Sequence, residues 1–150
     1  MRAIAFKGNK GGFDWALVEG DHRANAAIIE RSKSPAPVDE REAQLAWIFR
    51  EVEELLRLHT PSRAAILKVG GGTFSDSLGE RLEVDGVILA TLGSMRVPTQ
   101  AIKSVSLAKQ FNVKKTELDA LLDTFPCING LPKTHREIVA LGLSQLSPKT

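Results

Sequence analysis

The chain has 150 residues, and its 43% hydrophobic and 25% charged residues are close to ordinary globular usage, which argues against wholesale disorder. Its formal net charge of +2 permits an anionic partner without requiring one, and its single cysteine excludes an internal disulfide. No apolar run approaches the roughly 18 residues needed to cross a bilayer. The first residues lack the apolar core of a signal peptide, so we expect one cytoplasmic domain, residues 1–150, without a membrane segment.

Three short strands are predicted at the start of the chain. They are Ala3–Lys7, Asp14–Glu19 and Ala24–Arg31, and turn-forming residues follow each of them. Sequential strands this close together usually pair with each other, which predicts an antiparallel meander. Two prolines in Ser32–Val38 predict a loop after the third strand.

After the meander the hydrophobic pattern changes to a helical period. The predicted elements are a helix at Asp39–His59, a strand at Ala64–Val69, a helix at Leu78–Met95 and a strand at Val97–Ile102. Asp39 is the expected N-cap of the first helix, with Glu42 as its capping-box partner. The run at Ala64–Val69 is apolar except at Lys68, which is typical of a buried central strand.

The rest of the chain is predicted to be helical, at Ser104–Asn112, Lys115–Thr124 and Thr134–Leu146. A meander followed by strand–helix–strand units predicts an α/β fold. Its mixed five-stranded sheet would hold three antiparallel and two parallel strands, with helices on its faces. The functional crevice of such a sheet lies at the carboxyl ends of the strands, and the first and fourth strands end near Lys7 and Lys68.

Two glycine-rich segments look like phosphate-binding loops, KGNKGG at Lys7–Gly12 and VGGGT at Val69–Thr73. Neither matches the spacing of a P-loop or of a dinucleotide fingerprint, so we interpret them as a hairpin turn and a strand-to-helix turn. Gly70–Thr73 is the better phosphate candidate, because it follows a buried strand. Cys127 and His135 lie in no nucleophile motif, which disfavours a hydrolase.

Several segments resemble one family in the same order along the chain. They are AIAFKGN at Ala3–Asn9, AILKV at Ala65–Val69, the stretch Val97–Leu122 and THREIVALGL at Thr134–Leu143. In this order they resemble the ribonuclease H-like fold, and within it the RuvC-type Holliday-junction resolvases. A closer likeness is to small uncharacterised RuvC-like proteins, which also carry Lys-Gly-Asn after the first strand and a stretch similar to FSDSLGERLE, Phe74–Glu83.

The resemblance implies a degenerate catalytic site. Nucleases of this fold hold two Mg²⁺ ions with three or four converging carboxylates. Carried over by position, the acid of the first strand is Lys7, that of the fourth strand is Lys68, and those of the last helix are Thr134 and Glu137. Two like unit charges 4 Å apart repel by about 4 kcal/mol at an effective dielectric constant of 20, and a divalent ion about doubles this. We therefore expect no metal site, no cofactor and no catalysis.

The first functional hypothesis is an inactive RuvC-like protein that binds branched or duplex DNA through contacts to phosphate. The expected contacts are Lys7, Asn9, Lys10, Lys68, Lys103, Lys109, Lys114 and Lys115. Glu137 is expected to pair with Lys7 or Lys68, because buried charges are normally paired. Acids follow the last four lysines, so a solvated helix face also explains that cluster.

Two alternatives remain open. One is a metal-dependent endonuclease that uses Mg²⁺ and displaced acids, drawn from Asp14, Glu19, Asp76 and Glu137. The other is a non-catalytic interaction module that forms a homodimer, since the related resolvases act as pairs. Binding of a specific divalent ion distinguishes the endonuclease from the phosphate-binding protein. A steep loss of DNA affinity with salt distinguishes the phosphate-binding protein from the interaction module.

Overall fold

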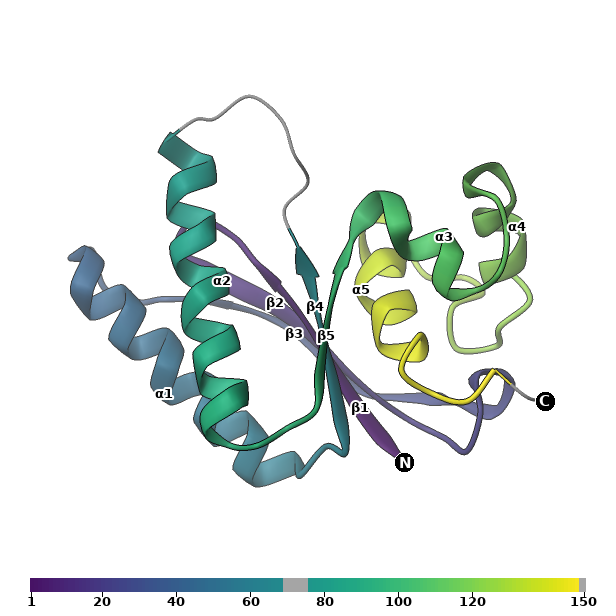
Figure 1. Cartoon of the computed structure of the whole chain (residues 1–150), viewed down its shortest axis with the longest axis horizontal. Helices are drawn as coiled ribbons and strands as arrows, with labels where there is room; N and C mark the ends of the chain where they lie inside the picture. Colours follow the sequence, from purple (N-terminus) through teal and green to yellow (C-terminus); the bar gives the residue numbers. More distant parts are fainter. Residues whose placement is uncertain (69–75, 149–150) are drawn as a thin grey trace.

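The computed structural model describes residues 1–68 and 76–148, and within them a mixed five-stranded sheet (Figure 1). The strands are β1 (Arg2–Gly8), β2 (Gly12–Glu19), β3 (Ala27–Pro35), β4 (Arg63–Lys68) and β5 (Thr99–Lys103). They lie in the order β3-β2-β1-β4-β5. The first three form an antiparallel meander, and β4 pairs parallel with β1 and with β5. The predicted α/β fold and strand directions are confirmed, while Gly70–Thr73 lies outside the described residues.

Helices cover both faces of the sheet. On one face lie α1 (Arg41–His59) and α2 (Asp76–Ser94), and on the other lies α5 (Lys133–Leu143) with the short α3 (Leu107–Gln110) and α4 (Leu118–Leu122) beside it (Figure 1). None of the helices in the described part of the chain is long and apolar enough to cross a bilayer.

The alternation of β1 divides the core into two layers. Ile4 and Phe6 are fully buried against the α1 and α2 side, whereas Ala3 and Ala5 are fully buried against the α5 side. Small side chains on the second face let α5 approach the sheet closely. A Cβ added at Gly142 of α5 would lie 3.2 Å from Val18 of β2, so glycine at this position allows the close approach of the helix to the sheet.

The third strand differs from its prediction. It was expected at Ala24–Arg31 with a loop from Ser32, but β3 runs from Ala27 to Pro35 and pairs with β2 along its length, as far as Gly12 opposite Pro35. Pairing with a long neighbour outweighs the loop-forming composition of these residues. Pro35 is tolerated because it ends an edge strand. The predicted start of the strand is instead a turn of 3₁₀ helix, Arg23–Asn25.

The predicted cap of α1 and the lengths of the last helices are also wrong. Helix α1 begins at Arg41 after Glu40, and no side chain caps it. The guanidinium of Arg41 instead donates hydrogen bonds to the carbonyls of Lys10 and Glu80, which ties the start of α1 to the β1–β2 turn and to α2. The helix predicted to reach Asn112 ends at Gln110, because Asn112 takes a left-handed conformation (φ 57°).

Candidate functional site

A row of charged residues crosses the meander near the carboxyl end of β1. Lys7 of β1 lies opposite Asp14 of β2, and Asp14 lies opposite Lys33 of β3. Alternation along the strands puts all three on the face that α5 covers, the face of Ala5 and Ala16. Two cations and one carboxylate therefore meet the first turn of α5 at this edge of the sheet.

Lys7 is paired with the carboxylate that the last helix retains. Its Nζ lies 3.9 Å from Oε1 of Glu137, and the two side chains are 39% and 36% exposed. Glu137 also accepts a hydrogen bond from the hydroxyl of Ser104, which follows β5. Because both charged groups are partly solvated, this pair contributes no more than about 1 kcal/mol to stability. It does place an ammonium group where the resemblance expects a metal-binding carboxylate.

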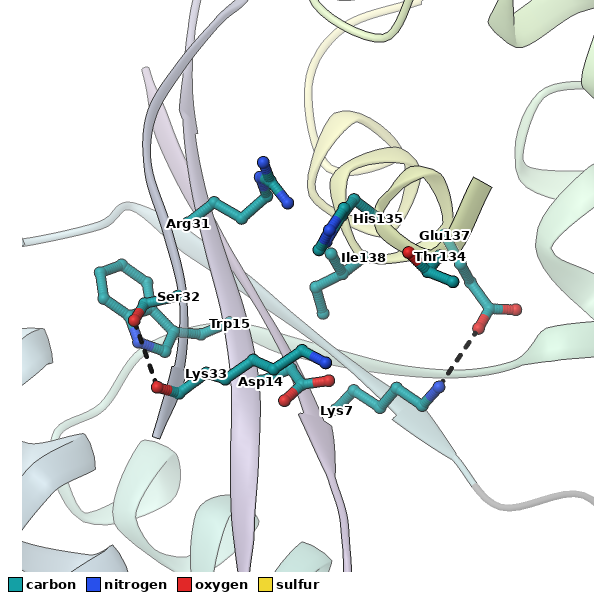
Figure 2. A pocket seen from close by; sticks show the side chains of 10 residues that line it. All are labelled: Lys7, Asp14, Trp15, Arg31, Ser32, Lys33, Thr134, His135, Glu137 and Ile138. Atoms are coloured by element: carbon teal, nitrogen blue, oxygen red, sulfur yellow. Dashed lines mark hydrogen bonds and ion pairs between the residues drawn. The ribbon is translucent and has the colours of Figure 1, made fainter. Parts of the chain in front are cut away.

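The row and α5 enclose a pocket of about 320 Å³ (Figure 2). Its lining residues are Lys7, Asp14, Trp15, Arg31, Ser32, Lys33, Thr134, His135, Glu137 and Ile138. Figure 2 shows Arg31 and Lys33 extending from β3 toward α5, while Lys7 points to Glu137. Sequence reasoning missed Arg31 and Lys33, because the predicted third strand ended at Arg31. If the strand is extended to Pro35, the alternation of side chains places Arg31 and Lys33 on the same face.

Lys7 and Lys68 were expected to converge, but the strand register places them on opposite faces of the sheet. Ala65 and Leu67 of β4 belong to the core under α5, whereas Ala64 and Ile66 belong to the core under α1 and α2. Alternation thus assigns Lys68 to the face opposite Lys7. Phe6 lies opposite Ile66, so the next residue of β4 on the α5 face is the buried Leu67. An apolar side chain, and not a second ammonium, therefore stands beside Lys7.

The β1–β2 turn has a structural role in the described contacts. The Asn9 amide donates to the carbonyl of Gly12, and the Asn9 side chain accepts from the amide of Gly11, as in a hairpin turn. The Nζ of Lys10 lies 3.9 Å from Glu80 of α2. The interpretation of KGNKGG as a turn is thus confirmed, and Lys10 reaches toward the α2 side instead of the pocket.

The other predicted lysines lie along β5 and the short helices that follow it. Lys103, Lys109, Lys114 and Lys115 are all exposed. Lys115 lines a second hollow of about 250 Å³ with Lys133, Arg136 and Glu137, and Glu137 also lines the first pocket. The two hollows therefore adjoin at Glu137 and give one surface with cations on both sides.

The displaced acids of the nuclease alternative do not gather at this site. Asp14 and Glu137 both line the pocket, but Glu19 lies at the far end of β2, where it pairs with Arg2 at 3.5 Å. The side chain of Asp76 lies outside the described residues. In the part of the chain that the structure describes, no group of three or more acidic, histidine or cysteine side chains is placed to hold a metal ion.

A buried carboxylate that sequence reasoning missed lies behind the end of β1, on the α2 side. Asp85 is 7% exposed, and burial raises its pKa to about 6, although Arg81 and the backbone amide of Gly8 oppose this shift. A Cβ at Gly8 would lie 2.2 Å from Oδ1 of Asp85, so the carboxylate packs directly on the backbone of β1. A larger residue at position 8 would force the Asp85 carboxylate to move.

No family model and no curated protein sequence matches the chain. Solved structures do match. RuvC of T. thermophilus in complex with a Holliday junction substrate superposes with a TM-score of 0.78 at 13% identity, over 96% of this chain and 92% of that one. Another Thermus thermophilus RuvC structure gives 0.74 at 16% identity with the same coverage. The yeast mitochondrial Holliday junction resolvase Ydc2 gives 0.58 at 8% identity, over 95% of this chain and 77% of that one.

The chain has the RuvC-like fold. The superposition spans nearly the whole chain, which confirms the resemblance seen in the order of the elements. Within this RuvC-like chain, the carboxyl end of the central strand carries Lys7, the neighbouring strand carries Leu67, and the last helix supplies Thr134 and Glu137. Of these four positions, where the resemblance expects acids, one carries a carboxylate and one carries an ammonium group.

Proposed function

We propose that this RuvC-like chain binds branched or duplex nucleic acid through contacts to phosphate and does not cleave it by a metal-dependent mechanism. The observation that carries the proposal is the ion pair between Lys7 and Glu137 at the carboxyl end of β1. A carboxylate that neutralises a lysine is a poor ligand for Mg²⁺, which prefers several hard oxygen ligands.

Electrostatics at this position favour an anion over a cation. A divalent ion at 4 Å from the Lys7 ammonium would be repelled by about 8 kcal/mol at an effective dielectric constant of 20, and solvent at the partly exposed side chain reduces that figure. Lys7, Arg31 and Lys33 outnumber Asp14 and Glu137 in the pocket, so its net charge is positive. Contacts of this kind position a nucleic acid without reading its sequence.

Cleavage and binding assays with purified protein test the two parts of this proposal. Four-way junction and duplex DNA are incubated with Mg²⁺ or Mn²⁺, and we expect no cleavage by the wild type or by Glu137→Ala. Cleavage by the wild type that disappears in Glu137→Ala would refute the inactive assignment. Binding in EDTA should weaken with a log–log salt slope of about −0.9 for each phosphate neutralised. Binding that needs a divalent ion would favour the endonuclease with displaced acids.

A second candidate function is self-association through α2, which an exposed apolar stripe favours. Leu82 is 47% exposed and Leu89 is 41% exposed, on the same side of the helix. Nothing lies within 4 Å of a Cβ added at Gly86 or Gly93, which leaves room for a second copy of α2 to approach closely. Analytical ultracentrifugation of the wild type and of Leu89→Glu tests this homodimer. A monomeric wild type at high concentration would rule it out.

A further inference from the structure

Strand β3 presents two cations whose charge is not neutralised. Arg31 and Lys33 are alternate residues of this edge strand, both exposed, and both line the pocket under α5. Neither side chain makes an ion pair or a hydrogen bond with any residue that the structure describes. Lys7 differs from them, because it forms an ion pair with Glu137. These two residues are therefore the cations of the pocket that remain available to an external anion.

The opposite wall of the pocket also suits an anion. It is formed by the first turn of α5, where Thr134 and His135 line the cavity. This turn contains no acidic residue, and no side chain caps its amides. The amides of this turn therefore add a partial positive charge to this wall of the pocket. A cavity of about 320 Å³ lies near the lower end of the range of about 300–1,000 Å³ found for ligand pockets.

We propose that Arg31 and Lys33 form a phosphate clamp on β3 that holds one backbone phosphodiester of a nucleic acid against the first turn of α5. This inference rests on the proposed function and gives it a specific subsite. An arginine side chain suits the task, because its planar guanidinium donates two parallel hydrogen bonds to phosphate oxygens. The serine between them, Ser32, lies on the other face of the strand by alternation and is not part of the clamp.

Substitution of Asp14 distinguishes a phosphate clamp from a metal site, because removing its charge should strengthen binding at the first and weaken binding at the second. Its carboxylate lies between Lys7 and Lys33 in the strand register and lines the same pocket. Next to a bound phosphate it is a like charge, so Asp14→Asn should tighten DNA binding by about fivefold at low salt. In a metal-dependent enzyme the same substitution removes a ligand and weakens metal-dependent binding or cleavage.

The experiment measures DNA binding by fluorescence anisotropy across a salt series in EDTA. It compares the wild type with Arg31→Gln/Lys33→Gln and with the matched control Arg50→Gln/Arg96→Gln. The control removes the same two charges from α1 and from the connection after α2, and both of its side chains are exposed. We expect the clamp variant to lower the magnitude of the log–log salt slope by about one, since the clamp contacts one phosphate and each phosphate contact contributes about 0.9. The control should leave the slope unchanged, and circular dichroism verifies that each variant is folded.

The possible results separate the clamp from the function on which it rests. A clamp variant that behaves like the control, or an Asp14→Asn variant that binds DNA less tightly, overturns the clamp while wild-type binding still supports the proposed function. Wild-type protein that fails to bind DNA overturns both. Pyrophosphate that binds in a manner dependent on Arg31 and Lys33, in the absence of DNA binding, would reveal a site for small anions and overturn the assignment to a nucleic-acid backbone.

Discussion

Replacing the buried carboxylate of α2 should stabilise this protein at neutral pH. Asp85 is 7% exposed, and its burial raises the pKa from 3.8 to about 6. At 1.36 kcal/mol for each pH unit, this difference corresponds to about 3 kcal/mol of stability lost when the group is ionised in the folded protein. Asp85→Asn removes the charge and keeps the shape, so we expect a gain of up to about 3 kcal/mol at pH 7.5.

The gain should depend on pH in a defined direction. Between pH 4 and pH 6 the folded protein keeps the Asp85 proton while the unfolded chain has lost it, so the stability of the wild type falls as the pH rises through this window. About one unit above pH 6 the loss is nearly complete, and it stays constant at higher pH. The advantage of Asp85→Asn should therefore be largest above pH 6 and should disappear toward pH 4.

Urea unfolding of the wild type and of Asp85→Asn at several pH values between 4 and 8 measures this effect. Asp21→Asn, which removes a carboxylate from an exposed position, is the matched control. An Asp85→Asn variant that is destabilised equally at pH 4 and pH 8 would refute the reasoning. That result would mean that the interactions of the carboxylate with Gly8 and Arg81 stabilise the protein by more than its burial destabilises it.

Three further substitutions probe the fold around the site, each by urea unfolding. Gly8→Ala should destabilise the protein by at least about 1 kcal/mol, because the new Cβ would lie 2.2 Å from Asp85; wild-type stability would show that the carboxylate moves freely. Arg23→Ala should lower the stability by about 2–4 kcal/mol. Arg23 is buried, donates hydrogen bonds to the carbonyls of Leu143 and Ser144, and lies over the Phe111 ring at 4.6 Å. An unchanged stability would show that these contacts do not stabilise the end of α5. Phe6→Ala should cost about 3–5 kcal/mol as a fully buried ring, and a cost under 1 kcal/mol would contradict the close packing of that face.

The sequence predicted the order of the elements, the strand directions and a buried strand that begins near Ala64. These features follow from local periodicity, which the residues of β1 and α1 display clearly. Boundaries that depend on pairing were less predictable. Ser32, Ser34 and Pro35 have the composition of a loop, yet hydrogen bonding to β2 makes them part of a strand.

The residues of the site were also predicted only in part, because their positions depend on strand register and packing. Lys7 and Glu137 were expected at one edge, and the structure pairs them. Lys68 was assigned to that edge because a strand ends near it, but its position in the alternation puts it on the other face. Asp85 could not be singled out, because the burial that raises its pKa arises from packing between α2 and β1 and leaves no local pattern in the sequence.

The burial of Leu67 makes the absence of a complete acidic site difficult to reverse. This side chain is 3% exposed and belongs to the hydrophobic core under α5. A glutamate in its place would have to ionise among apolar neighbours before any metal ion could compensate, at a cost of several kcal/mol. Such a substitution made alone would therefore lower the stability of the folded protein. The close packing of α5 on the sheet therefore makes an ionised side chain at position 67 costly to the fold.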